Sequence, residues 1–151
     1  MKLTAEGQAH IERFFRWHLR DAHLQLPVVS VHANQWTRAL TKPFRFGAIT
    51  FGRHVFVATN LVARDGDGRM RVPGWLLAHE LMHVIQYERA GMRRFLSAYL
   101  REYAQAMRRG RKLNAAGHWL AYRAITHEAE AYAAEAAYRQ WSERVETLML
   151  R

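Results

Sequence analysis

The residues most suited to chemistry lie in the segment AHELMHVIQYER, residues 78–89. Its two histidines, His79 and His83, are four residues apart, so on a helix both imidazoles project from one face. Such a pair can direct two ring nitrogens at a single Zn²⁺ ion. Glu80 lies roughly 100° around the helix from His79, where it can reach a metal-bound water and act as general base. This spacing predicts a hydrolytic zinc site.

The neighbours of this motif are apolar, which makes its polar side chains informative. Buried imidazoles and a buried carboxylate are costly without partners, and a metal ion supplies such a partner. The alternative is an amphipathic helix whose polar groups make ordinary hydrogen bonds. The apolar residues that would bury the helix are Leu76, Leu77, Leu81, Val84 and Ile85.

A catalytic zinc ion needs a third protein ligand and an open position for water. The residues that follow His83, VIQYERAG, contain no further histidine, so we expect a carboxylate from another helix. The segment 126–139 offers Glu128, Glu130 and Glu135 among alanines that allow close helix packing. Glu128 and Glu135 are seven residues apart and share a face, whereas Glu130 points about 200° away from Glu128. We expect Glu128 to be the third ligand and Glu135 to orient a zinc-bound histidine. The alternative for each glutamate is an ordinary solvated position.

A peptidase also needs a hydrogen-bond donor for the developing oxyanion. Three residues just before the expected ligand helix have suitable side chains: Tyr122, His118 and His127. We take Tyr122 as the catalytic candidate and keep the two histidines as alternatives. Each of the three is also a common residue type in cores and on surfaces.

Length and composition indicate one folded domain over residues 1–151. Half of the residues are hydrophobic and 24% are charged, as in globular proteins. The absence of cysteine excludes disulfides and thiolate ligands. No apolar run is long enough to span a bilayer, and the N-terminal segment, with Glu6 and Glu12, lacks the apolar core of a signal peptide. We therefore expect a cytoplasmic protein.

The net charge of +10 is unevenly distributed. From Glu88 to Lys112 there are eight Lys or Arg residues and two Glu, a net charge of +6. This segment motivates an alternative function, a non-catalytic module that binds nucleic acid, an anionic membrane or an acidic protein, with zinc structural or absent. The sequence contains no recognisable nucleic-acid-binding motif, so we do not expect nucleic acid as a partner. A solvated helix face is the simpler interpretation.

Periodicity and turn residues predict a predominantly helical α+β protein. In the expected helix over 93–109, the apolar stripe either packs on the core or docks on anionic membrane through Phe95 and Tyr99. The strand over 48–51, if it is an exposed edge, can pair with an extended peptide. Expected elements are a helix over 4–24, a strand over 28–32, a break at Lys42-Pro43, a type II′ hairpin of strands 48–51 and 54–57 around Gly52-Arg53, a loop over 64–70, a helix from Pro73-Gly74 to Gly91, the helix over 93–109, a basic break over 110–114, and a last helix from Thr126 as N-cap to about Leu148.

Three segments, HELMHVIQYERAG, RFLSAYLREY and AYRAITHEAEAY, together resemble a group of small bacterial zinc-metallopeptidase-like proteins related to minimal gluzincins. The resemblance runs from about residue 46 to residue 138. It implies a predominantly helical zincin fold with a small sheet before the His-Glu-x-x-His helix, and a peptide or protein substrate. By position it implies His79, His83 and Glu128 as zinc ligands and Glu80 as general base.

The chain departs from that family pattern at two positions next to the expected third ligand. Tyr132 follows the alanine of Glu-x-x-Ala, where related proteins often have Asp or Asn. His127 precedes Glu128, where we expect an apolar residue. These departures affect the surroundings of the expected ligands.

Overall fold

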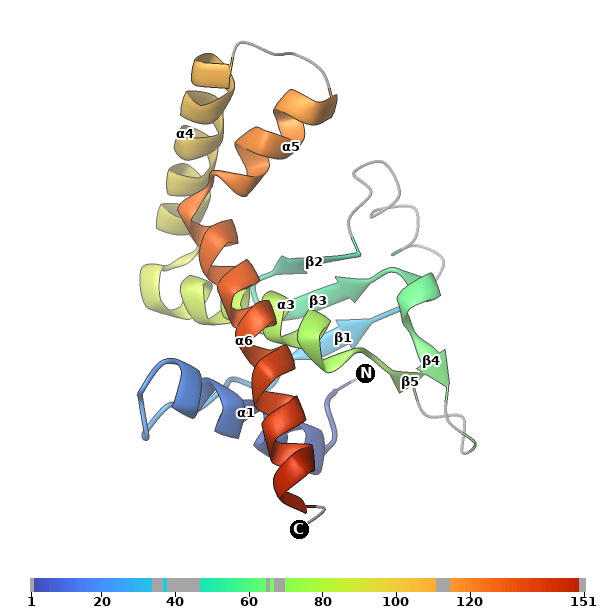
Figure 1. Ribbon diagram of the computed structural model, residues 1–151. Coiled ribbons are helices and arrows are strands. Elements are labelled where there is room, and N and C mark those ends of the chain that lie inside the picture. Colours follow the sequence, from blue (N-terminus) through green and yellow to red (C-terminus); the bar gives the residue numbers. More distant parts are fainter. Residues whose placement is uncertain are drawn as a thin grey trace.

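The computed structural model describes residues 2–33, 37, 47–64, 66, 70–110 and 115–149. Within these residues, five α-helices and a small amount of β-structure confirm the expected α+β, predominantly helical class (Figure 1). The helices are α1 (Ala5–His18), α3 (Gly74–Ala90), α4 (Met92–Gly110), α5 (Ala115–Arg123) and α6 (Thr126–Met149), and a 3₁₀ turn, η2, covers Thr59–Leu61. The strands are β1 (Ser30–His32), β2 (Ala48–Phe51), β3 (His54–Val57), β4 (Ala63–Arg64) and β5 (Met70–Arg71).

Helix α1 is shorter than the predicted helix over 4–24. It begins as expected, because the Thr4 hydroxyl accepts a hydrogen bond from the Gly7 amide at 3.1 Å and caps the first turn. It ends at His18, and Arg20 has a positive φ of 53°. The returning chain is held by side chains of the helix: Arg16 Nε donates to the Leu24 carbonyl at 2.9 Å, and Glu12 Oε2 accepts from the Leu26 amide at 3.0 Å.

The three-stranded sheet has the order β1-β3-β2. Strands β2 and β3 form the predicted antiparallel hairpin, with Phe51 opposite His54. Gly52 has a φ of 58° whereas Arg53 does not have a positive φ, as a type II′ turn requires. The predicted strand over 28–32 is reduced to β1, which pairs parallel to β3. Strand β2 therefore forms one edge of the sheet.

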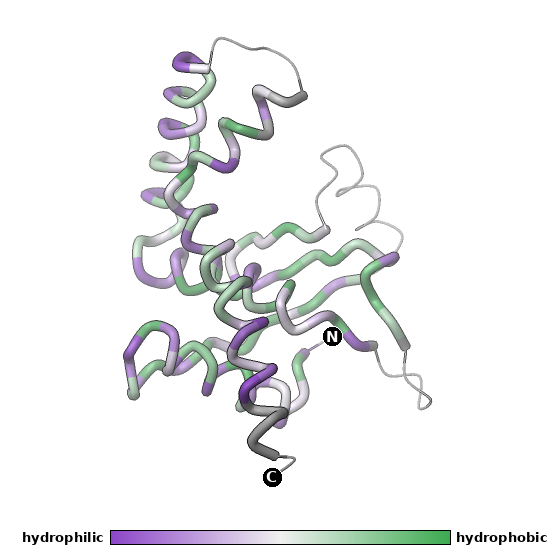
Figure 2. The backbone as a smooth tube through the Cα atoms, viewed as in Figure 1, coloured by the Kyte–Doolittle hydropathy of each residue, from purple (hydrophilic) through white to green (hydrophobic). Residues whose placement is uncertain are grey.

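Helix α3 lies between the sheet and α6 and carries much of the core (Figures 1 and 2). It spans the predicted segment and stops at Gly91, whose φ of 78° suits a helix end. The predicted close packing through alanines applies to Ala131 and Ala134, which are fully buried in α6, while Ala129 and Ala133 face solvent.

Helices α4 and α5 form a pair that projects beyond the sheet (Figure 1). Helix α4 matches its predicted range within one residue at each end, but Phe95 is the only member of its apolar stripe that is buried. Helix α5 was not predicted. Thr126 is the first residue of α6 rather than its N-cap, and its amide donates to Glu102 Oε2 of α4 at 2.7 Å.

Some predicted features lie outside the described residues. These are the Lys42-Pro43 break, residue 46 at the start of the family resemblance, residues 65 and 67–69 of the predicted loop, and residues 111–114 of the basic break. The ends of that loop pair as the short strands β4 and β5. Across the part of the chain that is described, no helix has both the length and the apolar character that crossing a membrane requires.

The first turn of α3 meets α6 so closely that Gly74 has no room for a side chain. A Cβ atom at this position would lie 2.6 Å from Cζ of Tyr138. We expect Gly74→Ala to lower the free energy of unfolding by about 1–3 kcal/mol, because overpacking outweighs the better helix propensity of alanine. Urea denaturation measures this change.

Gly110→Ala is the matched control, because a Cβ atom there would meet nothing within 4 Å. We expect it to change stability by less than about 0.5 kcal/mol. In a Tyr138→Leu background, Gly74→Ala should cost less than in the natural chain. Equal costs in both backgrounds would contradict the steric explanation.

Candidate metal centre

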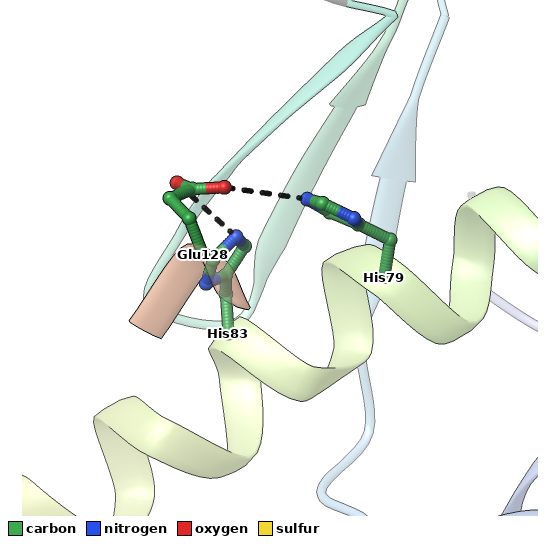
Figure 3. Close-up of side chains that lie close together, drawn as sticks. All are labelled: His79, His83 and Glu128. Carbon is green, nitrogen blue, oxygen red and sulfur yellow. Dashed lines mark ion pairs between the residues drawn. The ribbon is translucent and has the colours of Figure 1, made fainter. Parts of the chain in front are cut away.

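Helix α3 and helix α6 together bury four side chains that sequence reasoning singled out. His79, Glu80 and His83 come from the middle of α3, and Glu128 comes from the first turn of α6. All four are buried. One ligand atom from each of His79, His83 and Glu128 lies within 4.8 Å of the others, and among the described residues this is the group found able to hold a metal ion (Figure 3).

The two imidazoles face the same carboxylate through the same type of nitrogen. His79 Nε2 lies 3.6 Å from Glu128 Oε2, and His83 Nε2 lies 3.6 Å from Glu128 Oε1 (Figure 3). These separations exceed good hydrogen-bond lengths, so the three groups converge without closing on one another. Burial opposes ionisation of Glu128, but its interactions with His79 and His83 outweigh that effect and hold the pKa of its carboxyl well below the usual range.

The donor set fits a zinc ion. Glu128 Oε2 is buried and makes no hydrogen bond in the structure. An unsatisfied buried carboxylate oxygen is costly, and a divalent cation held jointly with two imidazole nitrogens would satisfy it. Two histidines and one glutamate also leave a fourth position for water or substrate, as in catalytic zinc sites.

The other ring nitrogen of each histidine faces a side-chain oxygen. His79 Nδ1 lies 3.5 Å from Glu135 Oε2, so Glu135 stands where the sequence predicts an orienting carboxylate. His83 Nδ1 lies 2.9 Å from Gln86 Oε1. When both Nδ1 atoms donate to these oxygens, both Nε2 lone pairs point to the centre, as metal ligation requires.

Gln86 was missed by sequence reasoning. It is buried, and its amide Nε2 donates to the His127 carbonyl at 3.0 Å and to Glu130 Oε2 at 2.8 Å. It therefore links His83 to the residue next to Glu128. The available signal was its spacing, because a residue three positions after His83 lies on the same face of the helix.

Tyr132, which departs from the pattern of the similar zinc-metallopeptidase-like proteins, contacts His79 in the structure. The ring of Tyr132 packs edge-on against His79, with 4.7 Å between centroids, and the guanidinium of Arg123 lies 3.8 Å from the centre of the tyrosine ring. Tyr132 thus supports the imidazole by packing. The oxygen that faces His79 Nδ1 comes from Glu135, one turn further along α6.

Glu80 lies beside the three converging groups and is fixed by the sheet. The hydroxyl of Thr50, on edge strand β2, donates to Glu80 Oε2 at 2.7 Å. Burial raises the pKa of the Glu80 carboxyl. Tyr87 in turn donates a hydrogen bond to the Thr50 carbonyl at 3.2 Å. Burial, and to a smaller extent the negative charges of Glu80 and Glu128, raises the pKa of Tyr87 to about 12.

The three oxyanion candidates occupy different places. Tyr122 is hydrogen-bonded to Glu128 and lines the pocket beside it. Burial, and to a smaller extent the negative charge of Glu128, raises the pKa of Tyr122. His118 is exposed on α5 and bonded to Tyr103, and His127 packs its ring on Phe95 with 4.5 Å between centroids. Neither histidine lines the pocket.

A second tyrosine, Tyr99 of α4, also reaches the site and was not predicted to do so. Its hydroxyl donates a hydrogen bond to Glu128 Oε1 at 3.1 Å. Burial, and to a smaller extent the negative charge of Glu128, raises the pKa of Tyr99. Tyr99 and Tyr122 therefore both remain protonated donors at neutral pH. Glu128 receives support from α4 and α5 as well as facing the histidines of α3.

An open pocket of about 320 Å³ leads to this centre. Its walls combine the edge strand with the aromatic side of α4, so most of the lining is apolar. The lining residues are Ala48, Ile49, Thr50, Phe51, Glu80, His83, Tyr87, Phe95, Leu96, Tyr99, Tyr122 and Glu128.

Comparison with known proteins gives one match. No curated protein and no solved structure is significantly similar to the chain. The model of the eCIS core domain matches residues 2–91. The matched region contains His79, Glu80 and His83 but ends before α4, so Glu128 lies outside it. Because the match spans more than half of the chain, the chain belongs to the eCIS core domain family.

Proposed function

We propose that this protein is a zinc-dependent metallopeptidase. The observation that carries the proposal is the convergence of two imidazole Nε2 atoms and a buried carboxylate within 4.8 Å, with each Nδ1 atom facing a side-chain oxygen. The alternative, an amphipathic helix whose polar groups make ordinary hydrogen bonds, does not require two imidazoles and a carboxylate to converge in this way. The chain has no cysteine and so needs no oxidising compartment to form disulfides, and we propose the cytoplasm as the place of action.

His79, His83 and Glu128 are the residues that would hold zinc. When bound there, zinc would supply Lewis-acid chemistry, polarising a carbonyl and lowering the pKa of a water molecule toward about 7. Glu80, fixed by Thr50, takes the proton of the attacking water and passes it to the leaving amine. Tyr122 keeps its proton and is the candidate donor to the developing oxyanion.

A peptide or protein substrate fits the shape of the site. Strand β2 is an edge of the three-stranded sheet and lines the pocket along its whole length. An extended peptide can pair with such an edge through main-chain hydrogen bonds. Because Thr50 belongs to this strand and contacts Glu80, pairing would bring the peptide backbone next to the general base.

Zinc content provides the first test. Protein purified without added metal should contain about one zinc ion per chain by elemental analysis. The double variant His79→Ala/His83→Ala should lose it, because two of three ligands are removed. The control His23→Ala/His118→Ala removes two exposed histidines and should keep the metal. Zinc retained by the first double variant would refute the proposed site.

The role of Glu80 is tested separately from metal binding. Glu80→Gln keeps the shape of the side chain but cannot accept a proton, so hydrolysis should fall at least about 100-fold while zinc is retained. Cleavage of a mixed-sequence peptide pool, followed by mass spectrometry, measures this. Glu88→Gln, on the exposed end of the same helix, is the matched control. Unchanged cleavage by Glu80→Gln would remove Glu80 from its role.

Gln86 allows a test of how the histidines are held. Gln86→Leu preserves bulk but removes the oxygen that faces His83 Nδ1, so zinc affinity should fall about 10- to 100-fold. Competition with a chromophoric chelator measures the affinity. Gln140→Leu makes the same substitution at an exposed position of α6 and should leave the affinity unchanged. Equal affinities for both variants would show that Gln86 does not orient the ligand.

A further inference from the structure

Helix α4 exposes leucines beside the mouth of the pocket. Leu96 is 37% exposed and Leu100 is 65% exposed, and because they are four residues apart they form one stripe. Phe51, at the end of β2, is 57% exposed and lines the same pocket as Leu96. The apolar surface around the pocket mouth therefore extends from the edge strand onto the projecting helix.

Five exposed arginines accompany these apolar residues on the same helix. Within the described parts of the chain, no carboxylate forms an ion pair with any of them, and Glu102 of α4 instead binds the Thr126 amide. Figure 2 shows hydrophilic positions recurring along α4. The arginines are Arg93, Arg94, Arg101, Arg108 and Arg109.

The arginines are arranged in register with the leucines. Arg94, Arg101 and Arg108 recur every seven residues and so share one face of the helix, roughly 100° from Leu100. Arg93 lies three residues before Leu96 and falls between the two stripes. An apolar stripe with arginines along its flank is the arrangement of helices that lie in a lipid headgroup region.

We propose that a surface made of Leu96, Leu100, Phe51 and four arginines of α4, here named the α4 face, docks the protein on an anionic lipid bilayer. The four arginines are Arg93, Arg94, Arg101 and Arg108. The arginines are complementary in charge to anionic headgroups, and their aliphatic stems can lie along the apolar boundary while the guanidinium groups reach phosphate. The exposed leucines and Phe51 then enter the boundary between headgroups and acyl chains. The mouth of the pocket faces the lipid surface in this orientation.

The composition of the α4 face favours lipid over nucleic acid. Proteins that bind single strands interleave basic residues with exposed aromatic rings on which bases stack. On α4 the aromatic residues are engaged elsewhere, since Phe95 is buried and Tyr99 bonds to Glu128. The exposed apolar side chains of α4 itself are aliphatic, and Phe51 of β2 is the single exposed aromatic ring of the α4 face, so this face suits acyl chains better than a row of stacked bases.

Co-sedimentation with lipid vesicles tests the proposal on the intact chain. We expect binding to vesicles of phosphatidylcholine mixed with phosphatidylserine, weak binding to phosphatidylcholine alone, and loss of binding as salt rises. Arg94→Glu/Arg101→Glu should weaken binding at least about tenfold, and Leu100→Ser should also weaken it. Leu100 and both arginines lie outside the pocket lining.

Matched controls separate the α4 face from net charge and general stickiness. Arg13→Glu/Arg144→Glu changes the net charge equally at exposed positions of α1 and α6, and Val28→Ser removes another exposed aliphatic side chain. These variants should bind like the natural chain, and circular dichroism should show that every variant is folded. Equal weakening by the controls, or no effect of Leu100→Ser, would overturn the proposal.

Two further results would also overturn the proposal. One is equal binding to neutral and anionic vesicles. The other is tighter binding to single-stranded DNA than to anionic vesicles at the same salt concentration. Because binding is measured without hydrolysis and zinc content is measured separately, failure of the docking proposal is distinguishable from failure of the proposed peptidase function.

Discussion

The structure depends on one buried carboxylate, Glu128, held between the imidazoles of His79 and His83. An ionised carboxylate loses a large solvation energy on burial, so it requires positive or hydrogen-bonding partners that are already in place. Those partners are the two imidazoles of α3 together with Tyr99 of α4 and Tyr122 of α5, and the close approach of α3 to α6 positions the imidazoles. The fully buried Ala131 and Ala134, and the absence of a side chain at Gly74 beside Tyr138, permit this approach.

Side-chain contacts around the centre link the neighbouring elements to the contact of Glu128 with the two histidines. Glu135 of α6 faces His79 of α3, and Gln86 of α3 binds the carbonyl of His127 beside Glu128. Thr50 extends the network from α3 to the edge strand through Glu80. A shift of α6 along α3 would therefore disturb both histidines at once. A packed interface that is satisfied in only one register is a suitable base for a metal site.

Sequence reasoning succeeded where spacing within one element determines the geometry. Two histidines four apart, glutamates seven apart and a glycine opening a hairpin turn each predict local arrangements that the structure contains. Sequence reasoning failed where contacts between distant segments determine the local structure. The apolar pattern of α1 continues past His18, but Glu12 and Arg16 bind the returning backbone and the helix ends. The parallel pairing of β1 with β3, the helix α5 and the contact of Tyr99 with Glu128 likewise depend on tertiary contacts that no local pattern encodes.

The match to the eCIS core domain ends at residue 91, and the chemistry of the centre explains why the remaining helices matter. The matched region supplies both histidines, Glu80, Thr50 and the edge strand, but among its described residues no carboxylate faces the two Nε2 atoms. Without α6, the polar residues of α3 would lose Glu128 and Glu135 together, along with the alanines that cover the helix. The matched part thus provides both histidines of the proposed metal centre, and α6 provides the carboxylate that faces them. Family membership therefore bears on two of the three proposed ligands, whereas the complete centre depends on how α6 packs on α3.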